Sequence, residues 1–422
     1  MWNKNVIRLP KRIASWLCRL LLRLYPRSKN RRDILLISNR ALMADYLAPF
    51  VALFEGDRRL RFHLLDHFDT DRQGGRDHIV NTLPFPLVSR RWAGLKRWDL
   101  MVTPGSGPLR DLVTCRRCPT LLTNHGTGTG KTIGGHHYPY SKRWILDDRG
   151  RLRFSRIFVP SHFIKDFATQ RVPELDGTLS VVGDMRLDKM ISKAKDREAV
   201  RRGLGFEPDD VVVFVISTWG PGNLFDTIGD PLLEAIGKLQ TEFRFVLSAH
   251  YAQYHAEPDV KHIWGEYLPT QTVKYGFQTR EQDEDWADYF VACDIVIADH
   301  GSLVNASTLL GRPLIFSPFP KELGLHNYIV EGSPIACLHE ISPTLAPDAS
   351  NLGDCLRLVA REYPYDKLKD VSLMISSCPG QSAEKMRQVT YDLLQYNAPE
   401  KQDCAETGQT GPLRDGARNE RT

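Results

Sequence analysis

Hydrophobic residues of this chain gather in short continuous runs, and longer segments of mixed character separate the runs from Asp33 onward. The first six runs end in small or polar residues and cover 33–39, 60–67, 98–105, 120–126, 156–162 and 179–184. Continuous apolar strands spaced by helix-length segments are typical of a parallel sheet that helices cover on both faces. The pattern therefore predicts a doubly wound, Rossmann-like α/β domain over residues 33–194.

The same rhythm restarts after a charged, helix-prone segment at 191–210. Four further runs lie at 211–220, 243–250, 294–301 and 313–319, and helices are predicted over 228–243 and 382–396. We expect a second doubly wound domain over residues 195–397 and, because it has little to bury, a disordered polar tail over 398–422. Two such domains would face a central cleft, with ligands where loops leave the carboxyl ends of the strands.

The net charge of +5 is unevenly distributed, because residues 1–32 contain ten basic side chains and no acid. Residues 33–422 therefore carry a formal charge of −5, which argues against a nucleic-acid groove across the main part of the protein. Within the basic segment, apolar residues recur at helical spacing, at Ile13, Trp16, Leu17, Leu20, Leu21 and Leu24. The stripe is shorter than the ~20 residues that span a bilayer, and arginines interrupt it.

We interpret residues 1–32 as a basic amphipathic helix that lies on an anionic membrane surface. A helix packed on the protein's own surface and a basic arm for RNA remain alternatives. The eight cysteines are scattered, and Cys115 and Cys118 form the one close pair. This pair lacks the second pair or the histidines of a zinc site, so a reduced protein is expected, with a redox motif as the alternative.

The loop at 125–132 reads HGTGTGKT and narrowly misses the phosphate-binding P-loop pattern, because His125 stands where its first glycine belongs. A histidine at a strand end, followed by glycines and Lys131, suits the close approach of an anionic ligand. His125 is a candidate general base for an attacking hydroxyl. A structural histidine in a turn is the other interpretation.

The loop after the run at 294–301 contains Asp299, His300, Gly301 and Ser302. It leads into an apolar segment at 303–310, for which we predict a helix with free first amides and Ser302 as N-cap or phosphate ligand. Such a helix end would hold a nucleotide diphosphate, although simple capping would also explain Ser302. The other strand-end candidates for the donor site are Arg186, Thr218 and His250.

Metal binding has weak support in the sequence. Asp69 and Asp71 form a short Asp-x-Asp, and His136 and His137 follow the glycine-rich loop without a nearby acid. We expect no metal and no cofactor, because positive groups and helix amides can stabilise a departing nucleotide.

Several of these segments together resemble the CDP-glycerol glycerophosphotransferases of teichoic-acid and capsule synthesis, over roughly residues 115–390. The resemblance implies a GT-B fold and a peripheral location at the cytoplasmic face of the cell membrane. It also implies transfer of glycerol phosphate from CDP-glycerol to a hydroxyl of a lipid-linked or polymer acceptor. His125, Gly126 and Thr127 match the family's His-Gly-Thr loop, which implies the base and the acceptor loop.

Other motifs of the family match in part. Its Gly-x-x-Arg-x-Asp segment matches Gly183, Arg186 and Asp188, its Thr-Trp matches Thr218 and Trp219, and its strand-end histidine matches His250. Its donor-diphosphate loop matches Asp299 and Ser302, with His300 and Gly301 between them. This chain has Gly128-Thr129-Gly130, Gly220 and Asn305-Ala306 where the family usually has Pro-Leu-Lys, an arginine and an acidic residue.

The leading hypothesis is a transferase of this type, in which His125 deprotonates the acceptor while Arg186 and the helix near Ser302 hold the diphosphate. The first alternative is a GT-B glycosyltransferase that uses a nucleotide sugar. The second is a non-catalytic, membrane-associated module that keeps the fold without the chemistry.

Overall fold

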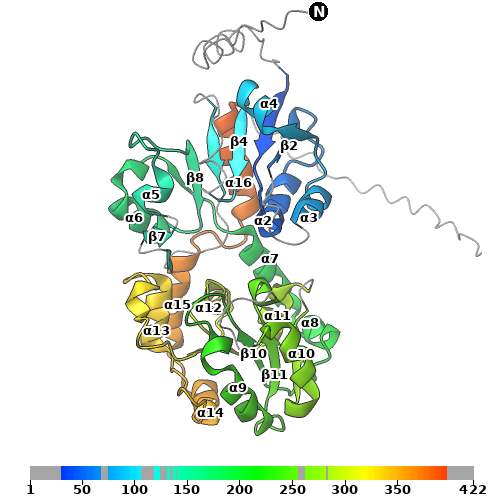
Figure 1. Ribbon diagram of the computed structural model, residues 1–422, viewed down its shortest axis with the longest axis vertical. Coiled ribbons are helices and arrows are strands. Elements are labelled where there is room, and N and C mark those ends of the chain that lie inside the picture. Colours follow the sequence, from blue (N-terminus) through cyan, green and yellow to red (C-terminus); the bar gives the residue numbers. More distant parts are fainter. Residues whose placement is uncertain are drawn as a thin grey trace, which may run out of the picture.

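The computed structural model describes residues 30–67, 75–105, 118–123, 131–133, 136–138, 140–254, 262–281 and 284–396. In this part of the chain, two parallel sheets are flanked by helices, which confirms the predicted α/β class (Figure 1). The first sheet has the strand order β3-β2-β1-β4-β5-β8-β9, and the second has β12-β11-β10-β13-β14. In each sheet the chain builds outward from a central strand to one side and then to the other, as in a doubly wound fold.

The first sheet contains all six strands predicted before residue 195. Its strands are β1 Arg32–Leu36, β2 Leu60–Asp66, β3 Leu87–Ser89, β4 Leu100–Thr103, β5 Thr120–Leu122, β8 Arg156–Val159 and β9 Leu179–Val181. Both faces are buried, because Ile34 and Leu36 belong to one hydrophobic cluster and Leu35 and Ile37 to another. The accompanying helices are α2 Ala41–Ala52, α3 Gly75–Thr82, α4 Arg90–Leu95, α5 Lys142–Ile145 and α6 His162–Arg171. An antiparallel hairpin of β6 Lys131–Ile133 and β7 His136–Tyr138 stands apart from the sheet.

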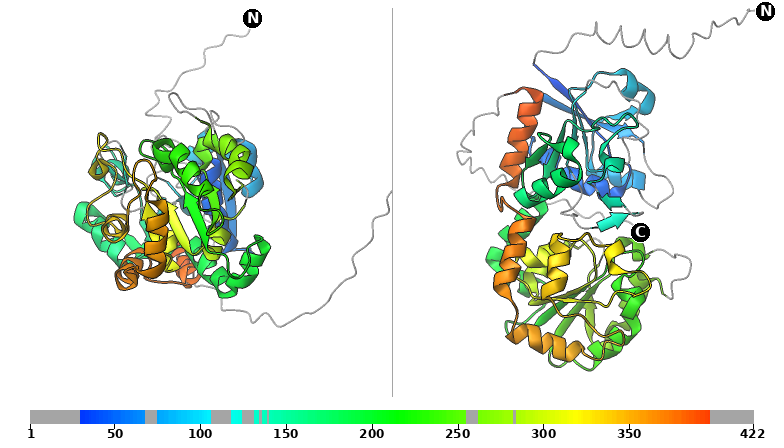
Figure 2. Two further views of the ribbon diagram at one scale, coloured as in Figure 1. Left: turned by 90° about the horizontal axis from the view of Figure 1, so that it is seen from below. Right: turned by 90° about the vertical axis from the view of Figure 1, so that its left-hand side faces the viewer.

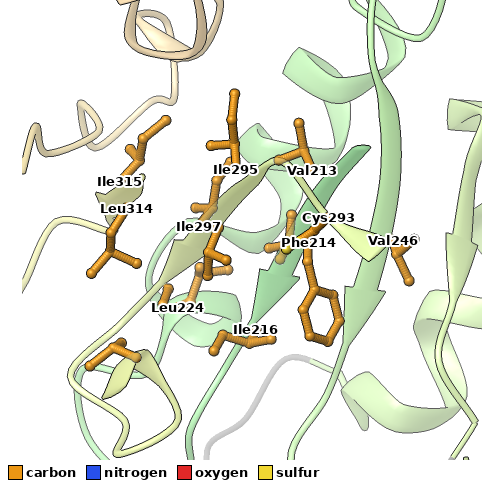
Figure 3. Close-up of a cluster of buried hydrophobic side chains, with 14 of the residues drawn as sticks. Val213, Phe214, Ile216, Leu224, Val246, Cys293, Ile295, Ile297, Leu314 and Ile315 are labelled. Atoms are coloured by element: carbon orange, nitrogen blue, oxygen red, sulfur yellow. The ribbon is translucent and has the colours of Figure 1, made fainter. Parts of the chain in front are cut away.

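The second sheet contains all four strands predicted after residue 195. They are β10 Val212–Ile216, β11 Arg244–Ser248, β13 Ile295–Ala298 and β14 Leu314–Phe316, with the unpredicted β12 Phe277–Thr279 at the edge. Figure 3 shows their apolar side chains, among them Phe214, Ile297 and Ile315, packed in one core. The helices around them are α7 Met185–Lys193, α8 Arg197–Gly203, α9 Leu224–Gly237, α10 Trp264–Tyr275, α11 Trp286–Ala292, α12 Val304–Leu309, α13 Pro334–Ile341 and α14 Leu352–Arg361.

The chain returns to the first sheet near its end. Helix α15 Tyr365–Ile375 packs beside α12 and α13, whereas α16 Ser382–Leu394 lies against the first sheet (Figure 2). Met386, Tyr391 and Leu394 join the core of the first sheet, and the Tyr391 hydroxyl donates to Asp57 Oδ2 at 2.8 Å. The last helix of the predicted 195–397 domain therefore packs with the first half of the protein.

No helix within the described ranges is long and apolar enough to cross a membrane. Residues 1–29, which include the predicted amphipathic helix, and the predicted tail at 398–422 lie outside the described residues. Both remain predictions.

Candidate functional site

Strands β10 and β13 lie side by side at the switch point of the second sheet, where the chain changes the direction in which it adds strands. Thr218 follows β10 and Asp299 follows β13, so the two residues meet at the carboxyl edge of the sheet. Ligands of open α/β sheets bind at this position.

The Asp299 carboxylate joins three segments at the switch point. Its Oδ2 accepts hydrogen bonds from the backbone N–H of Thr218 at 2.7 Å, the backbone N–H of Leu224 at 2.9 Å and the Ser217 hydroxyl at 3.2 Å. Its Oδ1 accepts from the Gly301 N–H at 2.9 Å. The side chain is buried, and its oxygens face protein donors. We predicted Asp299 as a donor-binding residue. In the structure its carboxylate holds together the loop after β10, the start of α9 and the loop after β13.

Two buried amides, which the sequence analysis missed, extend this network. Gln253 Nε2 donates to Asn223 Oδ1 at 2.9 Å, and Gln253 Oε1 accepts from the backbone N–H of His250 at 3.0 Å. Asn223 also caps α9 by accepting from the Asp226 N–H at 3.0 Å, and its Nδ2 donates to the Gly220 carbonyl at 2.9 Å. An asparagine directly before an apolar helix is a capping signal that could have revealed Asn223.

Trp219 and His250 lie next to this hydrogen-bond network, and Trp219 is partly exposed to solvent. The Trp219 side chain is 46% exposed, and its ring centroid lies 6.4 Å from that of His250 at an angle of 38°. His250 Nδ1 accepts a hydrogen bond from the backbone N–H of Ala252 at 3.2 Å. In the neutral ring the proton is therefore on Nε2, which makes that atom a hydrogen-bond donor.

His300 and Gly301 belong to the loop that Asp299 holds, and His300 is buried there. The buried His300 ring makes edge contacts with Phe319, at 5.2 Å between centroids, and with Tyr328, at 5.9 Å. A Cβ added to Gly301 would lie 3.1 Å from the Thr218 Cβ, so glycine permits the close approach of the two loops.

The predicted cap of the following helix is wrong. Helix α12 begins at Val304 with Leu303 as N-cap, and no side chain caps it. The backbone N–H groups of Val304 and Asn305 donate to the carbonyls of Gly301 and Ser302 at 3.4 and 3.3 Å. The chain tightens into successive turns before the helix, so these amides are not free for a diphosphate as we expected. Ser302 itself is exposed.

The β6–β7 hairpin connects the predicted acceptor loop with the second half of the protein. His125, Gly126 and Thr127 lie outside the described residues, and Lys131 is the first residue of β6. The backbone N–H of Thr132 donates to the Tyr328 carbonyl at 3.0 Å. Tyr328 in turn packs on His300, which belongs to the loop after β13. Strand β6, at the end of the predicted acceptor loop, therefore contacts a residue that packs on the predicted donor loop.

Arg186 lies with the first sheet. Its Nη2 donates to Asp184 Oδ2 at 2.7 Å, its Nε donates to Asp184 Oδ1 at 3.3 Å, and its guanidinium carbon lies 4.0 Å from the centroid of the Tyr46 ring. Burial lowers the pKa of the Arg186 guanidinium, but the charges of Asp184 and Tyr46 and the hydrogen bonds to both side chains together outweigh burial and raise that pKa above its ordinary value. We expected Arg186 to clamp the donor diphosphate; in the structure its guanidinium makes two hydrogen bonds to the Asp184 carboxylate, and its role toward a donor stays a prediction.

Gly183 and Asp188, from the same motif, anchor the return of the chain to the first half. Asp188 accepts from the backbone N–H groups of Gly380 at 2.7 Å and Ser382 at 2.8 Å, directly before α16. Gly183 has φ +85°, and a Cβ there would collide with the Ser382 side chain. The first and last residues of the Gly-x-x-Arg-x-Asp segment, Gly183 and Asp188, therefore both hold the start of α16 in place.

No cluster of three or more potential metal-binding His, Cys, Asp or Glu side chains occurs among the residues that the structure describes. Asp69 and Asp71 lie outside those residues, and the backbone of His136 and His137 forms part of β7.

Comparison with solved structures identifies the fold. The wall teichoic acid polymerase TagF, in a structure determined after a soak with CDPG, aligns with 90% of this chain and 93% of its own, at 15% identity and a TM-score of 0.59. The chain has the fold of TagF. TagF is a CDP-glycerol glycerophosphotransferase, so the resemblance expected from the motifs is confirmed at the level of the fold.

Enzymes that act on UDP-GlcNAc share the same architecture. The UDP-GlcNAc 2-epimerase from Neisseria meningitidis, bound to UDP-GlcNAc, aligns with 86% of this chain and 100% of its own, at 11% identity and a TM-score of 0.52. The enzyme from Methanocaldococcus jannaschii, in complex with UDP-GlcNAc and UDP, aligns over 85% and 99%, at 13% identity and a TM-score of 0.51. These neighbours are of the GT-B type. No family model matches the chain, and no curated protein matches it by sequence.

Proposed function

We propose that the protein is a transferase that moves glycerol phosphate, or a related polyol phosphate, from a CDP-activated donor to a hydroxyl of a lipid-linked or polymer acceptor in cell-surface polymer synthesis. The observation that carries the proposal is the convergence of Thr218, His250 and Gly301, from three strand ends, around Asp299 and Gln253 at the switch point. This site occurs in a chain with the fold of TagF, which has been soaked with CDPG.

The donor is proposed to bind over the exposed side of this network. The half-exposed Trp219 ring offers a flat face on which a nucleobase can stack. His250 Nε2–H and the exposed Ser302 hydroxyl can donate hydrogen bonds to the diphosphate. Asp299 would act indirectly, because its oxygens fix the loops that present these groups.

The proposed reaction is an in-line displacement at phosphorus. His125 takes the proton of the acceptor hydroxyl, and the resulting oxygen nucleophile attacks the phosphorus that carries glycerol. The bond between that phosphorus and the bridging oxygen breaks, and the electron pair leaves with CMP. Gly126, Thr127 and Lys131 would position the acceptor, since holding two reactants in line removes much of the entropic barrier. Hydrogen-bond donors would stabilise the departing charge without a metal.

Residues 1–32 are proposed to hold the enzyme at the cytoplasmic face of the membrane, where a lipid-linked acceptor would be located. Their charge and apolar stripe suit an anionic lipid surface. Co-sedimentation with anionic vesicles tests this part: deletion of residues 1–30 should abolish binding, and unchanged binding would refute it.

A nucleotide sugar is the second candidate donor. It is favoured by the shared fold of enzymes that bind UDP-GlcNAc. The acceptor would then attack the sugar carbon, and a nucleoside diphosphate would leave in place of CMP.

The experiment that separates these candidates is a donor screen with the purified full-length protein. CDP-glycerol, CDP-ribitol and UDP-GlcNAc are each incubated with acceptor, and the released nucleotide is identified by chromatography. CMP is the expected product, whereas UDP would support the sugar nucleotide. Nucleotide binding without any release would support the non-catalytic module. His250→Ala should weaken donor binding, and His162→Ala, an exposed change on α6, is the matched control.

A further inference from the structure

Three aromatic side chains, His300, Phe319 and Tyr328, pack together beside the switch point of the second sheet, and we call them the aromatic cluster. The His300 ring centroid lies 5.2 Å from that of Phe319 and 5.9 Å from that of Tyr328, and the other two centroids are 5.2 Å apart. Aromatic rings attract one another at centroid distances of about 4.5–7 Å. The cluster joins the loop after β13 to the segment between β14 and α13.

The aromatic cluster supports both loops of the proposed donor site. His300 lies in the loop after β13 and is buried there. Phe319 packs against the loop after β10, because a Cβ added to Gly222 would collide with the Phe319 ring. Gly222 has φ +75°, and the same loop carries Trp219. A nucleotide held by these two loops would therefore rest on segments that the same rings support.

Tyr328 connects the aromatic cluster to the hairpin of β6 and β7. The backbone N–H of Thr132 donates to the Tyr328 carbonyl at 3.0 Å, and the Thr132 hydroxyl donates to the Asn327 carbonyl. Thr132 and Asn327 are 195 positions apart in the sequence, so these bonds cross from the first half of the protein to the second. The Tyr328 ring thus packs on the loop after β13, while its carbonyl holds the strand at the end of the predicted acceptor loop.

The hairpin depends on such contacts for its position. In the described part of the chain, β6 and β7 pair with each other in a sheet of two strands. A two-stranded hairpin is at best marginally stable by itself in water. The hydrogen bonds of Thr132 to the second half therefore influence where the hairpin lies and how often it opens.

We propose that the aromatic cluster couples donor binding to the placement of the acceptor loop, with Tyr328 as the positioning residue. A donor that holds the loops after β10 and β13 stabilises the packing of His300 and Phe319 on Tyr328, whose backbone then holds Thr132 more firmly. Coupling between two ligands is reciprocal, so a bound acceptor raises the affinity for the donor by the same factor. The inference rests on the proposed function, which assigns the two ligands to these loops.

Hydrogen–deuterium exchange of the full-length protein, measured by mass spectrometry with CDP as the probe, tests the coupling. The reporter is the peptide that contains Thr132, because opening of the hairpin exposes its amide to exchange. Tyr328→Ala removes the ring and keeps the backbone carbonyl, whereas Tyr328→Phe keeps the ring. Tyr365→Ala, at a tyrosine of α15 that is 53% exposed, is the matched control. A peptide from β10 shows whether a variant is destabilised as a whole.

CDP should slow exchange of the Thr132 peptide at least fivefold in the wild type, the lower end of typical allosteric coupling. The same slowing is expected in Tyr328→Phe and Tyr365→Ala. In Tyr328→Ala the peptide should exchange faster, and CDP should protect the loops after β10 and β13 without slowing it. Protection of those loops without slowing at Thr132 in the wild type, or equal slowing in Tyr328→Ala, would overturn the proposal.

Phe319→Ala separates this inference from the proposed function, because its effect needs no nucleotide. Loss of the Phe319 ring should speed exchange at Thr132 at least fivefold in the free protein. It should add little in a protein that already carries Tyr328→Ala, since both changes break the same series of contacts. An unchanged rate in Phe319→Ala would overturn the inference even where CDP binds. If CDP does not bind and Phe319→Ala still speeds exchange, the proposed donor fails, whereas the link between the aromatic cluster and the hairpin stands.

Discussion

Asp299 Oδ2 accepts a hydrogen bond of 2.7 Å from the backbone N–H of Thr218, which joins the ends of the two neighbouring strands β13 and β10. The same oxygen also accepts from Leu224 at the start of α9, and Oδ1 accepts from Gly301. One buried carboxylate thus fixes three backbone segments at the switch point. These contacts hold together the loops that form the proposed donor site.

Asp299→Asn should destabilise the protein, because an amide NH2 replaces one oxygen and faces a backbone donor. We expect a loss of about 1–3 kcal/mol in the free energy of unfolding, the cost of a buried polar group left without its partner. Urea denaturation measures the change. Asp148→Asn, at a fully exposed carboxylate, is the control and should be close to neutral. Equal stability of the two variants would contradict the role of Asp299.

Gly183→Ala tests the anchoring of the last helix. Gly183 and Gly56 both have positive φ, at +85° and +82°, so alanine is strained at either position. A Cβ at residue 183 would also collide with Ser382, whereas nothing lies within 4 Å of a Cβ at residue 56. Gly183→Ala should therefore cost about 1–3 kcal/mol more than Gly56→Ala, as overpacking does. Chemical denaturation measures both unfolding free energies. If the two variants differ by less than this, α16 moves to make room for the added Cβ at little cost.

Trp219→Ala should weaken nucleotide binding with little effect on stability, because the ring is 46% exposed. Loss of base stacking costs about 1–3 kcal/mol, which corresponds to a rise in the Kd for CDP of roughly 5- to 150-fold. Trp219→Phe should retain most of the affinity. Trp92→Ala, at an exposed tryptophan on α4, is the control for isothermal titration. An unchanged Kd in Trp219→Ala would remove Trp219 from the donor site.

The buried His339 should make the stability of the protein depend on pH. Its ring stacks on Phe316 at 3.5 Å between centroids, and burial, with a smaller effect of His300, lowers its pKa from 6.5 to about 4. The unfolded chain therefore binds a proton at a pH where the folded protein does not. Stability is complete above about pH 6.5 and is lost as the pH falls from there toward 4.

We expect His339 to account for about 2 kcal/mol of the difference in unfolding free energy between pH 7 and pH 5. Denaturation at the two pH values measures this difference. His339→Phe keeps an aromatic ring against Phe316 and should reduce the difference by that amount. The same pH dependence in wild type and variant would show that other groups cause it.

The strands were predictable because most are buried on both faces. All five residues of β10 are buried, which produces a continuous apolar run, whereas β12 has three residues with one buried and gives no such signal. Because Thr218 and Asp299 follow predicted strands, the sequence also placed both residues at the correct edge of the sheet. The sequence could not reveal the turns that engage the first amides of α12, because Asp299, at the start of that loop, is held by Thr218 and Leu224, which lie more than seventy residues earlier in the chain.

The partners of Arg186 were equally hidden from the sequence. Tyr46, whose ring lies against the Arg186 guanidinium, comes from α2, more than a hundred residues earlier. This contact does not follow from local periodicity. Asp184, two residues from Arg186, was visible in the sequence, but its bidentate geometry depends on how α7 begins.

Transfer of a phosphoryl group that carries glycerol can be followed directly with a label on that phosphorus. The full-length protein is incubated with acceptor and CDP-glycerol that is radiolabelled at the phosphorus attached to glycerol. We expect the label to appear in the acceptor product while unlabelled CMP is released, and we expect His125→Asn to abolish both. Label that remains with the nucleotide, released as CDP, would contradict this expectation.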